Sequence, residues 1–367
     1  MKKILLFSFL FFNSCPFVWA QSGLKHILLE EFSTAPCGFC PDGDLIAAQL
    51  IIDHPEVIWV THHAGFGTDA MTIPESVTIA NTFTTFAPGG CIDRGDYPIP
   101  VYTIAPFIAI SRQKWDSVCV AHLNDPAIVD VYIHNDYDTV TRILNCTVTA
   151  NFISAPAPGD LRLNLFLAED SVMGIGNGYD QHSYFNTQVG HPYYGMGDTI
   201  IGYVHHHVMR DVVSPTWGLN GIIPASPVAG SSYTHLFSNI SIPVAWKNKD
   251  MDVIAFVSYY NDSAKLRQVI NSNHKPLLDD SWSDVSEILE EKNSTSIYPN
   301  PNSGNFFVEL KSETATLEVF NLLGEKVFST QLKNNLEEMK LNVRAGIYLC
   351  RISGSGFVEN HRLVVQQ

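Results

Sequence analysis

The stretch that most constrains this chain is a pair of cysteines two residues apart, Cys37 and Cys40. An apolar extended segment at residues 26–32 precedes the pair, and a helical pattern at residues 43–52 follows it. At a helix start, the helix dipole and the unpaired backbone N–H groups favour a thiolate. A second thiol about one turn further on can attack a mixed disulfide formed at the first. The spacing therefore indicates a redox pair, and a static disulfide that staples the loop is the alternative.

Length and charge narrow the class of protein. With 367 residues the chain is long enough for two or three domains. It carries 37 acidic residues against 22 basic ones, a net charge of −15. Such an excess of negative charge argues against nucleic acid or an anionic membrane surface as a partner.

The first residues have the pattern of a secretory signal. Two lysines and an apolar run lie within residues 2–12, and Ala20 ends a segment suited to cleavage, so residues 1–20 are predicted to be a signal peptide. Cys15 allows the alternative of a lipoprotein signal, but the three residues before it form a poor lipobox. No later stretch has the roughly 20 apolar residues of a membrane span. We therefore expect an exported chain without a transmembrane helix after processing.

Six cysteines remain once Cys15 is removed with the signal. In an oxidising compartment an even number permits disulfides, but only the first pair has a spacing that specifies one. Cys91 follows Pro88 by three residues and is either a third redox thiol or a buried structural residue, the reading that its apolar surroundings favour. The sequence leaves open the pairing of the other cysteines, which are Cys91, Cys119, Cys146 and Cys350.

The order of elements predicts a multidomain protein, part α/β and part all-β. Residues 21–125 alternate strands with helices, as expected for a small α/β layer fold. Residues 126–275 contain strand-like runs separated by Gly, Pro, Asn and Asp, which is typical of an antiparallel β-sandwich. A long glycine-rich loop at residues 171–199 is long enough to suggest a function. Six carboxylates between residues 279 and 291 indicate a solvated linker or a short acidic helix, placed at residues 276–296.

Individual elements of the front segment are also predicted. Strands are expected at residues 26–32 and 57–63, and residues 86–94 read as a turn-rich break. Helices are expected at residues 43–52, 79–86 and 105–123.

The final segment, residues 297–367, resembles a type A sorting domain of the type IX secretion system. The matching residues are Ile297-Tyr298-Pro299-Asn300-Pro301 with Gly304, Val319 to Gly324, Ala345 to Leu349, and Arg362 to Val365. The resemblance implies a small Ig-like β-sandwich recognised by the type IX translocon. It also implies delivery to the cell surface or the exterior, with the tail either kept or removed.

The front resembles thioredoxin-like proteins, and the front and middle together resemble the outer membrane protein family named for a 28-kDa surface antigen. The motifs are the Leu29 to Thr34 opening, the Cys-x-x-Cys-Pro, Pro88-Gly89-Gly90 with Asp93-Arg94, Glu169-Asp170, and His205 to Arg210. The resemblance spans about residues 25–275.

The thioredoxin resemblance assigns four residues. It makes Cys37 the attacking thiol and Cys40 the resolving thiol. Glu31, six residues before Cys37, matches the buried acid that handles the resolving thiol's proton, and burial there would raise the pKa of the carboxyl. Pro88 matches the cis-proline beside the active site. The sequence departs from thioredoxin at two points. Pro36 replaces the usual aromatic residue before the first cysteine, and the intervening Gly38-Phe39 is not the dipeptide of a known strong reductant or oxidant. Both departures leave the direction of electron flow open.

The histidine motifs of the chain point less clearly to a function. On a strand, His205 and His207 would share a face that a metal could use, but no placed carboxylate or cysteine accompanies them, so we expect structural histidines, as for His62 and His63. No cofactor and no metal is predicted. Two functions remain: thiol–disulfide exchange on protein substrates, or a non-enzymatic surface binding or structural protein with a static disulfide. An exported location is expected for both.

Overall fold

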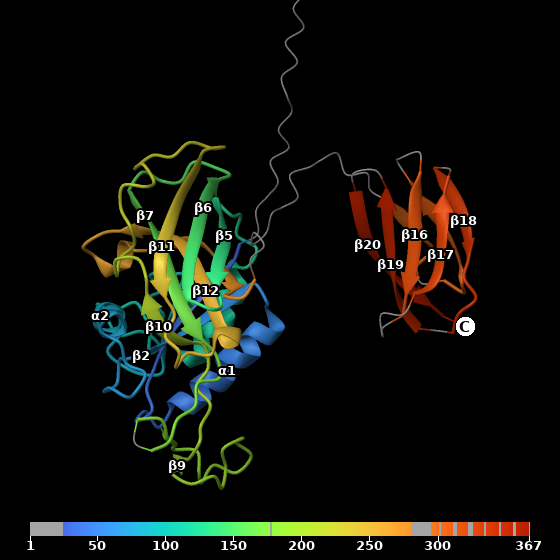
Figure 1. Ribbon diagram of the computed structural model, residues 1–367. Helices are drawn as coiled ribbons and strands as arrows, with labels where there is room; N and C mark the ends of the chain where they lie inside the picture. Colours follow the sequence, from blue (N-terminus) through green and yellow to red (C-terminus); the bar gives the residue numbers. More distant parts are fainter. Residues whose placement is uncertain are drawn as a thin grey trace, which may run out of the picture. The chain divides into compact units, whose positions relative to one another are not determined.

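The computed structural model describes residues 25–176, 178–279 and 295–366, apart from residues 301, 311–313, 322–325, 334, 345 and 355–356. The predicted signal peptide and most of the acidic linker lie outside the described residues. The chain divides into two compact units, Met1–Asp284 and Val285–Gln367 (Figure 1).

The first unit is built on one mixed sheet of eight strands in the order β13-β12-β7-β10-β2-β1-β3-β4. β2 pairs in parallel with both β1 and β10, and the other neighbours are antiparallel. The strands are β1 (Ile27–Ser33), β2 (Val57–His63), β3 (Gly89–Ile92), β4 (Ile110–Ser111), β7 (Asp160–Glu169), β10 (Val208–Val212), β12 (Met251–Tyr260) and β13 (Val269–Pro276).

Strand β1 is buried on both faces because helices cover both sides of this part of the sheet. Leu28 and Phe32 pack in the core that holds α2 (Pro74–Phe83), whereas Ile27 and Leu29 pack in the core beneath α1 (Cys40–Asp53) and α3 (Trp115–His122). Figure 1 shows α1 and α2 on opposite sides of β2. Side chains alternate along a strand, so the neighbours Glu30 and Glu31 point into different cores.

Proline fixes the start of both helices. Pro41 and Pro74 stand at the first helical positions, where a missing N–H costs nothing. The predicted strands 26–32 and 57–63 are present, and the first helix begins at Cys40 instead of residue 43. The helix predicted over 79–86 lies at α2, five residues earlier, and the turn-rich break contains strand β3.

The helix predicted over residues 105–123 was wrong in its first half. Residues 107–109 form no regular element, and Ile110 begins the short strand β4, where it pairs with Gly90 of β3. A short 3₁₀ turn, Arg112–Lys114, then leads into α3. The apolar run alone did not distinguish a buried strand from a helix.

The middle segment forms a sandwich. Its outer sheet has the order β11-β6-β5 and packs through an apolar core onto β7, β12 and β13. The inner layer therefore belongs to the same sheet that carries β1, and β10 hydrogen-bonds to β2. The boundary expected at residues 125/126 separates two patterns in the sequence but not two compact units, because their strands share one sheet. The outer strands are β5 (Val129–Asp138), β6 (Ile143–Phe152) and β11 (Ser232–Ser241).

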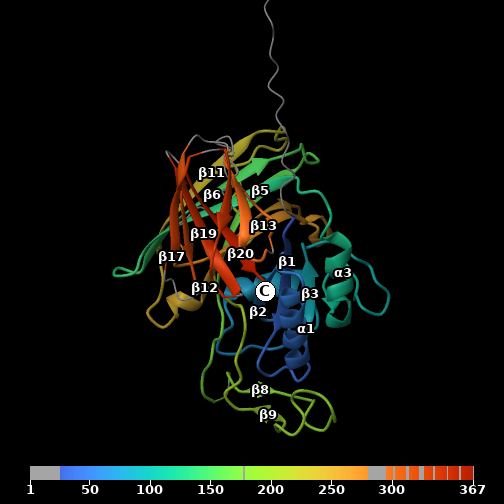
Figure 2. The same ribbon diagram turned by 90° about the vertical axis from the view of Figure 1, so that its right-hand side faces the viewer.

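The long loop between β7 and β10 reaches back to the front of the chain. It contains a short hairpin, β8 (Gln181–His182) and β9 (Thr199–Ile200). Figures 1 and 2 show this hairpin at one end of the unit, beyond α1. We call residues 178–205 the covering segment.

The second unit consists of two antiparallel sheets, ordered β14-β15-β18 and β17-β16-β19-β20, around one apolar core. Two packed sheets form a small β-sandwich, as the resemblance of this segment implied. The bounds are β14 (Ser296–Tyr298), β15 (Asn305–Glu309), β16 (Ala315–Phe320), β17 (Lys326–Leu332), β18 (Leu336–Lys340), β19 (Gly346–Gly354) and β20 (Phe357–Val365).

Candidate functional site

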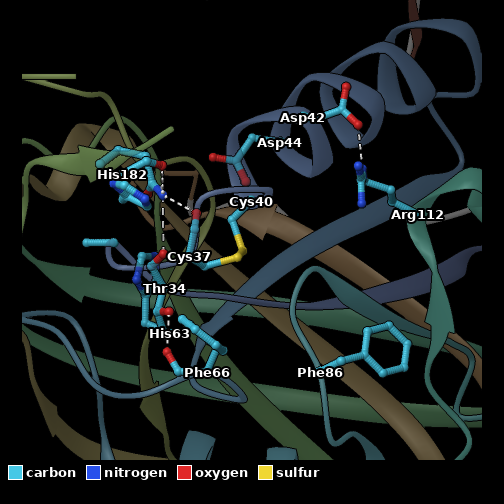
Figure 3. The surroundings of a disulfide bond; sticks show 12 residues. Thr34, Cys37, Cys40, Asp42, Asp44, His63, Phe66, Phe86, Arg112 and His182 are labelled. Carbon is cyan, nitrogen blue, oxygen red and sulfur yellow. Dashed lines mark hydrogen bonds and ion pairs between the residues drawn. A yellow bond between two sulfur atoms is a disulfide. The ribbon is translucent and has the colours of Figure 1, made fainter. Parts of the chain in front are cut away.

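The two cysteines of the Cys-x-x-Cys motif form a disulfide between the end of β1 and the start of α1 (Figure 3). Cys40 is the first residue of the helix and is completely buried, and Cys37 in the preceding loop is 3% exposed. The Cys37 backbone N–H donates to the Thr34 carbonyl, and the Cys40 N–H donates to the Cys37 carbonyl. The loop therefore consists of two tight turns, which place Cys37 just before the helix.

Neighbouring loops hold this turn in place. The backbone N–H of Ala35 donates to Asp69 Oδ2, which also bonds His63 Nδ1 at 2.6 Å. The Thr34 hydroxyl donates to the Phe66 carbonyl. His63, predicted to be structural, therefore orients the carboxylate that anchors the cysteine loop.

Glu31 is buried behind the disulfide. Trp59 Nε1 donates to its Oε2 at 2.9 Å, and a Cβ added at Gly43 would lie 2.7 Å from its Oε1. The carboxyl group therefore lies against the first turn of α1. Burial raises its pKa well above the usual value, and the nearby Asp44 carboxyl raises it further. Both effects favour the protonated form of the carboxyl.

Pro88 lies on the other side of that glycine. The Ala87–Pro88 peptide bond is cis, as expected from the sequence, and the added Gly43 Cβ would lie 2.8 Å from Pro88 Cβ. Glu31 and Pro88 therefore both lie against Gly43, and only a glycine fits between them and the helix without displacing one of them. All four predicted site residues gather at the junction of β1, α1 and β3.

Two residues of this site were missed in the sequence. Asp44, 6% exposed, lies on α1 four residues after Cys40 and accepts a 2.6 Å hydrogen bond from the Tyr203 hydroxyl. Its position on the Cys40 face of α1 was a usable signal, since residues four apart on a helix are neighbours. Nothing in the sequence indicated Tyr203 as a site residue, because it belongs to the covering segment, which is distant in sequence from the cysteine pair.

The covering segment closes one side of the cysteine loop. Gln181 Nε2 donates to the Cys37 carbonyl at 2.8 Å, and the N–H of His182 donates to the Ala35 carbonyl. The Tyr184 N–H bonds the Gly38 carbonyl, and its ring lies so close that a Cβ at Gly38 would be 2.6 Å away. The glycine between the cysteines is thus required for this contact.

Exposed aromatic side chains border the cysteine loop, and one of them, Phe39, packs edge-on against Tyr184 of the covering segment. Phe66 is 53% exposed and Phe39 is 48% exposed, and Phe86 lies on the loop before Pro88. The Arg112 guanidinium lies over the Phe39 ring and pairs with Asp42. Figure 3 shows Phe66, Phe86 and Arg112 around the disulfide on the side away from His182.

The histidine run differs from its prediction. Strand β10 begins at Val208, and His207 has a positive φ of 48°, so His205 and His207 do not share a strand face. His205 Nε2 bonds the Tyr179 carbonyl, and His206 pairs with Asp170. Among the described residues no group of His, Cys, Asp and Glu is arranged to hold a metal.

Cys91 lies in a different core from the disulfide. It is buried on β3 opposite Glu30, in the core that contains α2, and burial raises its thiol pKa well above the usual value. The thiolate needed for exchange is therefore disfavoured there. The three other free cysteines in the described residues are also buried: Cys119, Cys146 and Cys350.

Comparison with known proteins defines the class. Residues 87–278, just over half of the chain, match the family model for outer membrane protein Omp28, and the chain belongs to this family. Residues 296–366 match the secretion system C-terminal sorting domain, the element recognised by the type IX secretion system. The protein is therefore exported to the outer membrane or cell surface. No helix among the described residues is long and apolar enough to cross a membrane.

The first of two similar solved structures shares the fold. HBP35 of Porphyromonas gingivalis is 20% identical with a TM-score of 0.52, over 94% of this chain and 99% of that chain. A domain of the outer membrane lipoprotein Omp28 from Porphyromonas gingivalis is 14% identical with a TM-score of 0.24, over 42% of this chain and 92% of that chain. No curated protein matches the sequence.

Proposed function

We propose that this exported protein carries out thiol–disulfide exchange at Cys37 and Cys40. The observation that carries the proposal is the disulfide at the start of α1, with the buried Glu31 carboxyl and Pro88 both against Gly43 in the first turn of that helix. A disulfide that only crosslinks the loop does not need a buried acid against this turn. The substrates would be protein thiols or disulfides met at the cell surface.

The order of elements supports a thioredoxin-like front. It reads β1-α1-β2-α2-β3-β4-α3, with sheet order β4-β3-β1-β2, β1 and β2 parallel, and β3 antiparallel to β1. In thioredoxin-like proteins this arrangement places the cysteine pair and the cis-proline at the same edge. The difference here is that the sheet continues through β10 into the sandwich.

The exchange starts from the oxidised protein. A substrate thiolate attacks Cys37 Sγ, a new S–S bond forms, and the Cys37–Cys40 bond breaks with Cys40 leaving as a thiolate. The leaving sulfur takes up a proton. A second substrate thiolate then attacks the substrate sulfur of the mixed disulfide and releases Cys37, so the substrate gains a disulfide and the protein becomes a dithiol. The reverse sequence reduces a substrate.

A direct test uses the full mature chain. Recovery of activity from a scrambled-disulfide ribonuclease, and precipitation of insulin, are followed with the wild type, with Cys37→Ser, and with Cys350→Ser as the matched control. Cys350 is a buried thiol in the other compact unit, so its replacement should leave the exchange unchanged. Loss of activity in Cys37→Ser alone supports the proposal, whereas equal rates in all three rule it out.

One observation favours the second candidate, a surface binding or structural protein with a static disulfide. The covering segment bonds the Cys37 loop, and Cys37 is almost fully buried. Under this alternative the disulfide should resist millimolar dithiothreitol in the folded protein and open only with unfolding. Trapping with an alkylating reagent and mass measurement separates the two.

A further inference from the structure

Two carboxyl groups meet behind the disulfide, and each has one oxygen without another partner. Trp59 Nε1 donates a hydrogen bond to Glu31 Oε2, and the Tyr203 hydroxyl donates one to Asp44 Oδ2. Among the described residues, Glu31 Oε1 and Asp44 Oδ1 are buried and accept no hydrogen bond from a third group, and the two side chains interact with each other. A proton held between these two oxygens would satisfy both.

Electrostatics favours such a proton. Two carboxylates side by side in a buried site repel each other strongly when both are ionised, so the pair binds one proton more tightly than either acid would alone. Burial raises the pKa of both Glu31 and Asp44, and their mutual repulsion raises that of Glu31 further. Arg112 lowers the pKa of Glu31, and His63 and His206 lower that of Asp44, but burial, which raises the pKa, is the largest cause for both carboxyl groups.

The pair is placed to serve the inner cysteine. Asp44 follows Cys40 by four residues on α1, so the two side chains project from the same helix face, one turn apart. Figure 3 shows Asp44 beside Cys40. Gly43, between them in sequence, lets Glu31 approach the same turn from β1.

We propose that Glu31 and Asp44 share one proton in the oxidised protein and deliver it to Cys40 Sγ when the disulfide opens. The inference deepens the proposed exchange and rests on it. When a thiolate attacks Cys37 Sγ, the S–S bond breaks, Cys40 leaves with the electron pair, and the shared proton moves to its sulfur. The pair recovers a proton from solvent. In the opposite direction it accepts the Cys40 proton as that sulfur attacks.

Tyr203 is a positioning residue for Asp44. Its hydroxyl donates to Oδ2, a bond that favours the ionised form of Asp44 and leaves Oδ1 turned to Glu31. Because Tyr203 belongs to the covering segment, the loop after β7 helps to set the acid–base behaviour of a site built by β1 and α1. The other titratable or charged groups that influence the pair are Arg112, His63, His206 and Tyr193.

The test measures how fast dithiothreitol opens the disulfide in the full mature chain, by acid quench, alkylation and mass measurement, from about pH 5 to about pH 8. Asp44→Asn and Glu31→Gln should each slow opening at least about tenfold near pH 7, since the acid that protonates the leaving sulfur is lost. In Asp44→Asn the rate relative to the wild type should recover as the pH is lowered, because acid restores the proton to Glu31. Asp53→Asn, an exposed carboxylate at the far end of α1, is the matched control.

Further variants sharpen the result. The double variant should be no slower than the slower single one, because a shared proton can be lost only once. Tyr203→Phe should shift the pH profile of opening to higher pH, since Asp44 loses a bond that favours its charged form. A purely structural role would change rates equally at every pH.

The inference fails if Asp44→Asn keeps the wild-type pH profile, or if the two single effects add. Infrared spectra of the oxidised wild type test it without any variant: a protonated carboxyl band should persist above about pH 6, and its absence overturns the proposal. If dithiothreitol opening depends on Asp44 while protein substrates are not exchanged, the proposed function fails and the proton pair stands.

Discussion

Glu30 and Glu31 are adjacent on β1, equally buried, and opposite in their acid–base behaviour. Glu30 faces the core that holds α2, and Glu31 faces α1. Burial alone would raise both pKa values, yet that of Glu30 is lowered to about 2, whereas that of Glu31 is raised. The strand supplies the same burial on both sides, so the partners decide the charge.

On the α2 side the partner is a cation. Arg94 donates to both oxygens of Glu30, at 2.6 and 2.7 Å, and His62 Nε2 lies 3.2 Å from the same carboxylate. Aromatic rings surround the guanidinium, among them Phe83 and Phe256. This pair is completely buried and serves structure. On the α1 side the partner is a second acid, which makes Glu31 a proton store.

The largest expected effect comes from breaking the structural pair. Arg94→Met should lower the free energy of unfolding by about 3–5 kcal/mol, because it leaves the Glu30 charge buried without a partner. Urea denaturation at neutral pH measures this loss. In Glu30→Gln/Arg94→Met most of it should return. Lys265→Met, which breaks the surface pair with Asp96, should cost less than about 1 kcal/mol. A single-variant loss no larger than that of the surface control would contradict the assignment.

Low pH should also remove the contribution of the Glu30–Arg94 pair to the free energy of unfolding. The Glu30 pKa is lowered from 4.5 to about 2, so its stabilising effect is present above about pH 4.5 and is lost as the pH falls toward 2. The wild type should lose about 3 kcal/mol more than the Glu30→Gln/Arg94→Met variant over that range. Urea midpoints at a series of pH values measure the difference, and parallel curves would refute it.

On the Glu31 side, Gly43→Ala should destabilise the oxidised protein by about 1–3 kcal/mol, because the new methyl group overlaps Glu31 Oε1 and Pro88. The same variant should slow opening of the disulfide. Gln49→Ala, at an exposed position of α1, is the control and should be neutral or stabilising. Equal stability of the two variants would mean that the helix is not held against Glu31.

The smallest expected effect is a gain in stability, from replacing Glu31. The raised pKa of Glu31 means that the folded protein binds its proton more tightly than the unfolded chain, so the wild type loses stability as the pH rises from about 4.5. Glu31→Gln removes this loss and should be more stable than the wild type near pH 8, with no gain near pH 4. Denaturation of the oxidised forms measures it, with exposed Glu56→Gln as a control. A gain independent of pH would point to packing instead.

Much of the site could be read from sequence, because its residues are local or have a specific spacing. Cys37 and Cys40 follow a strand and start a helix, Glu31 is on that strand, and Pro88 precedes a glycine pair. The apolar run after Pro106 was misread, since its pairing with β3 depends on residues that lie far away in sequence. The covering segment was recognised only as a long glycine-rich loop, because its contacts to the cysteine loop join residues more than 140 positions apart.

The spacing of residues by itself determined the cysteine pair and its position before a helix, and resemblances to known families pointed to the acid, the proline and the sorting tail. Only the tertiary structure decided that the front and middle segments share one sheet, and that Asp44 and Tyr203 join the site. It also decided the charge of each neighbouring glutamate. The physical reason is that the pKa of a buried carboxyl depends on the groups packed against it, and the fold brings those groups from distant parts of the chain.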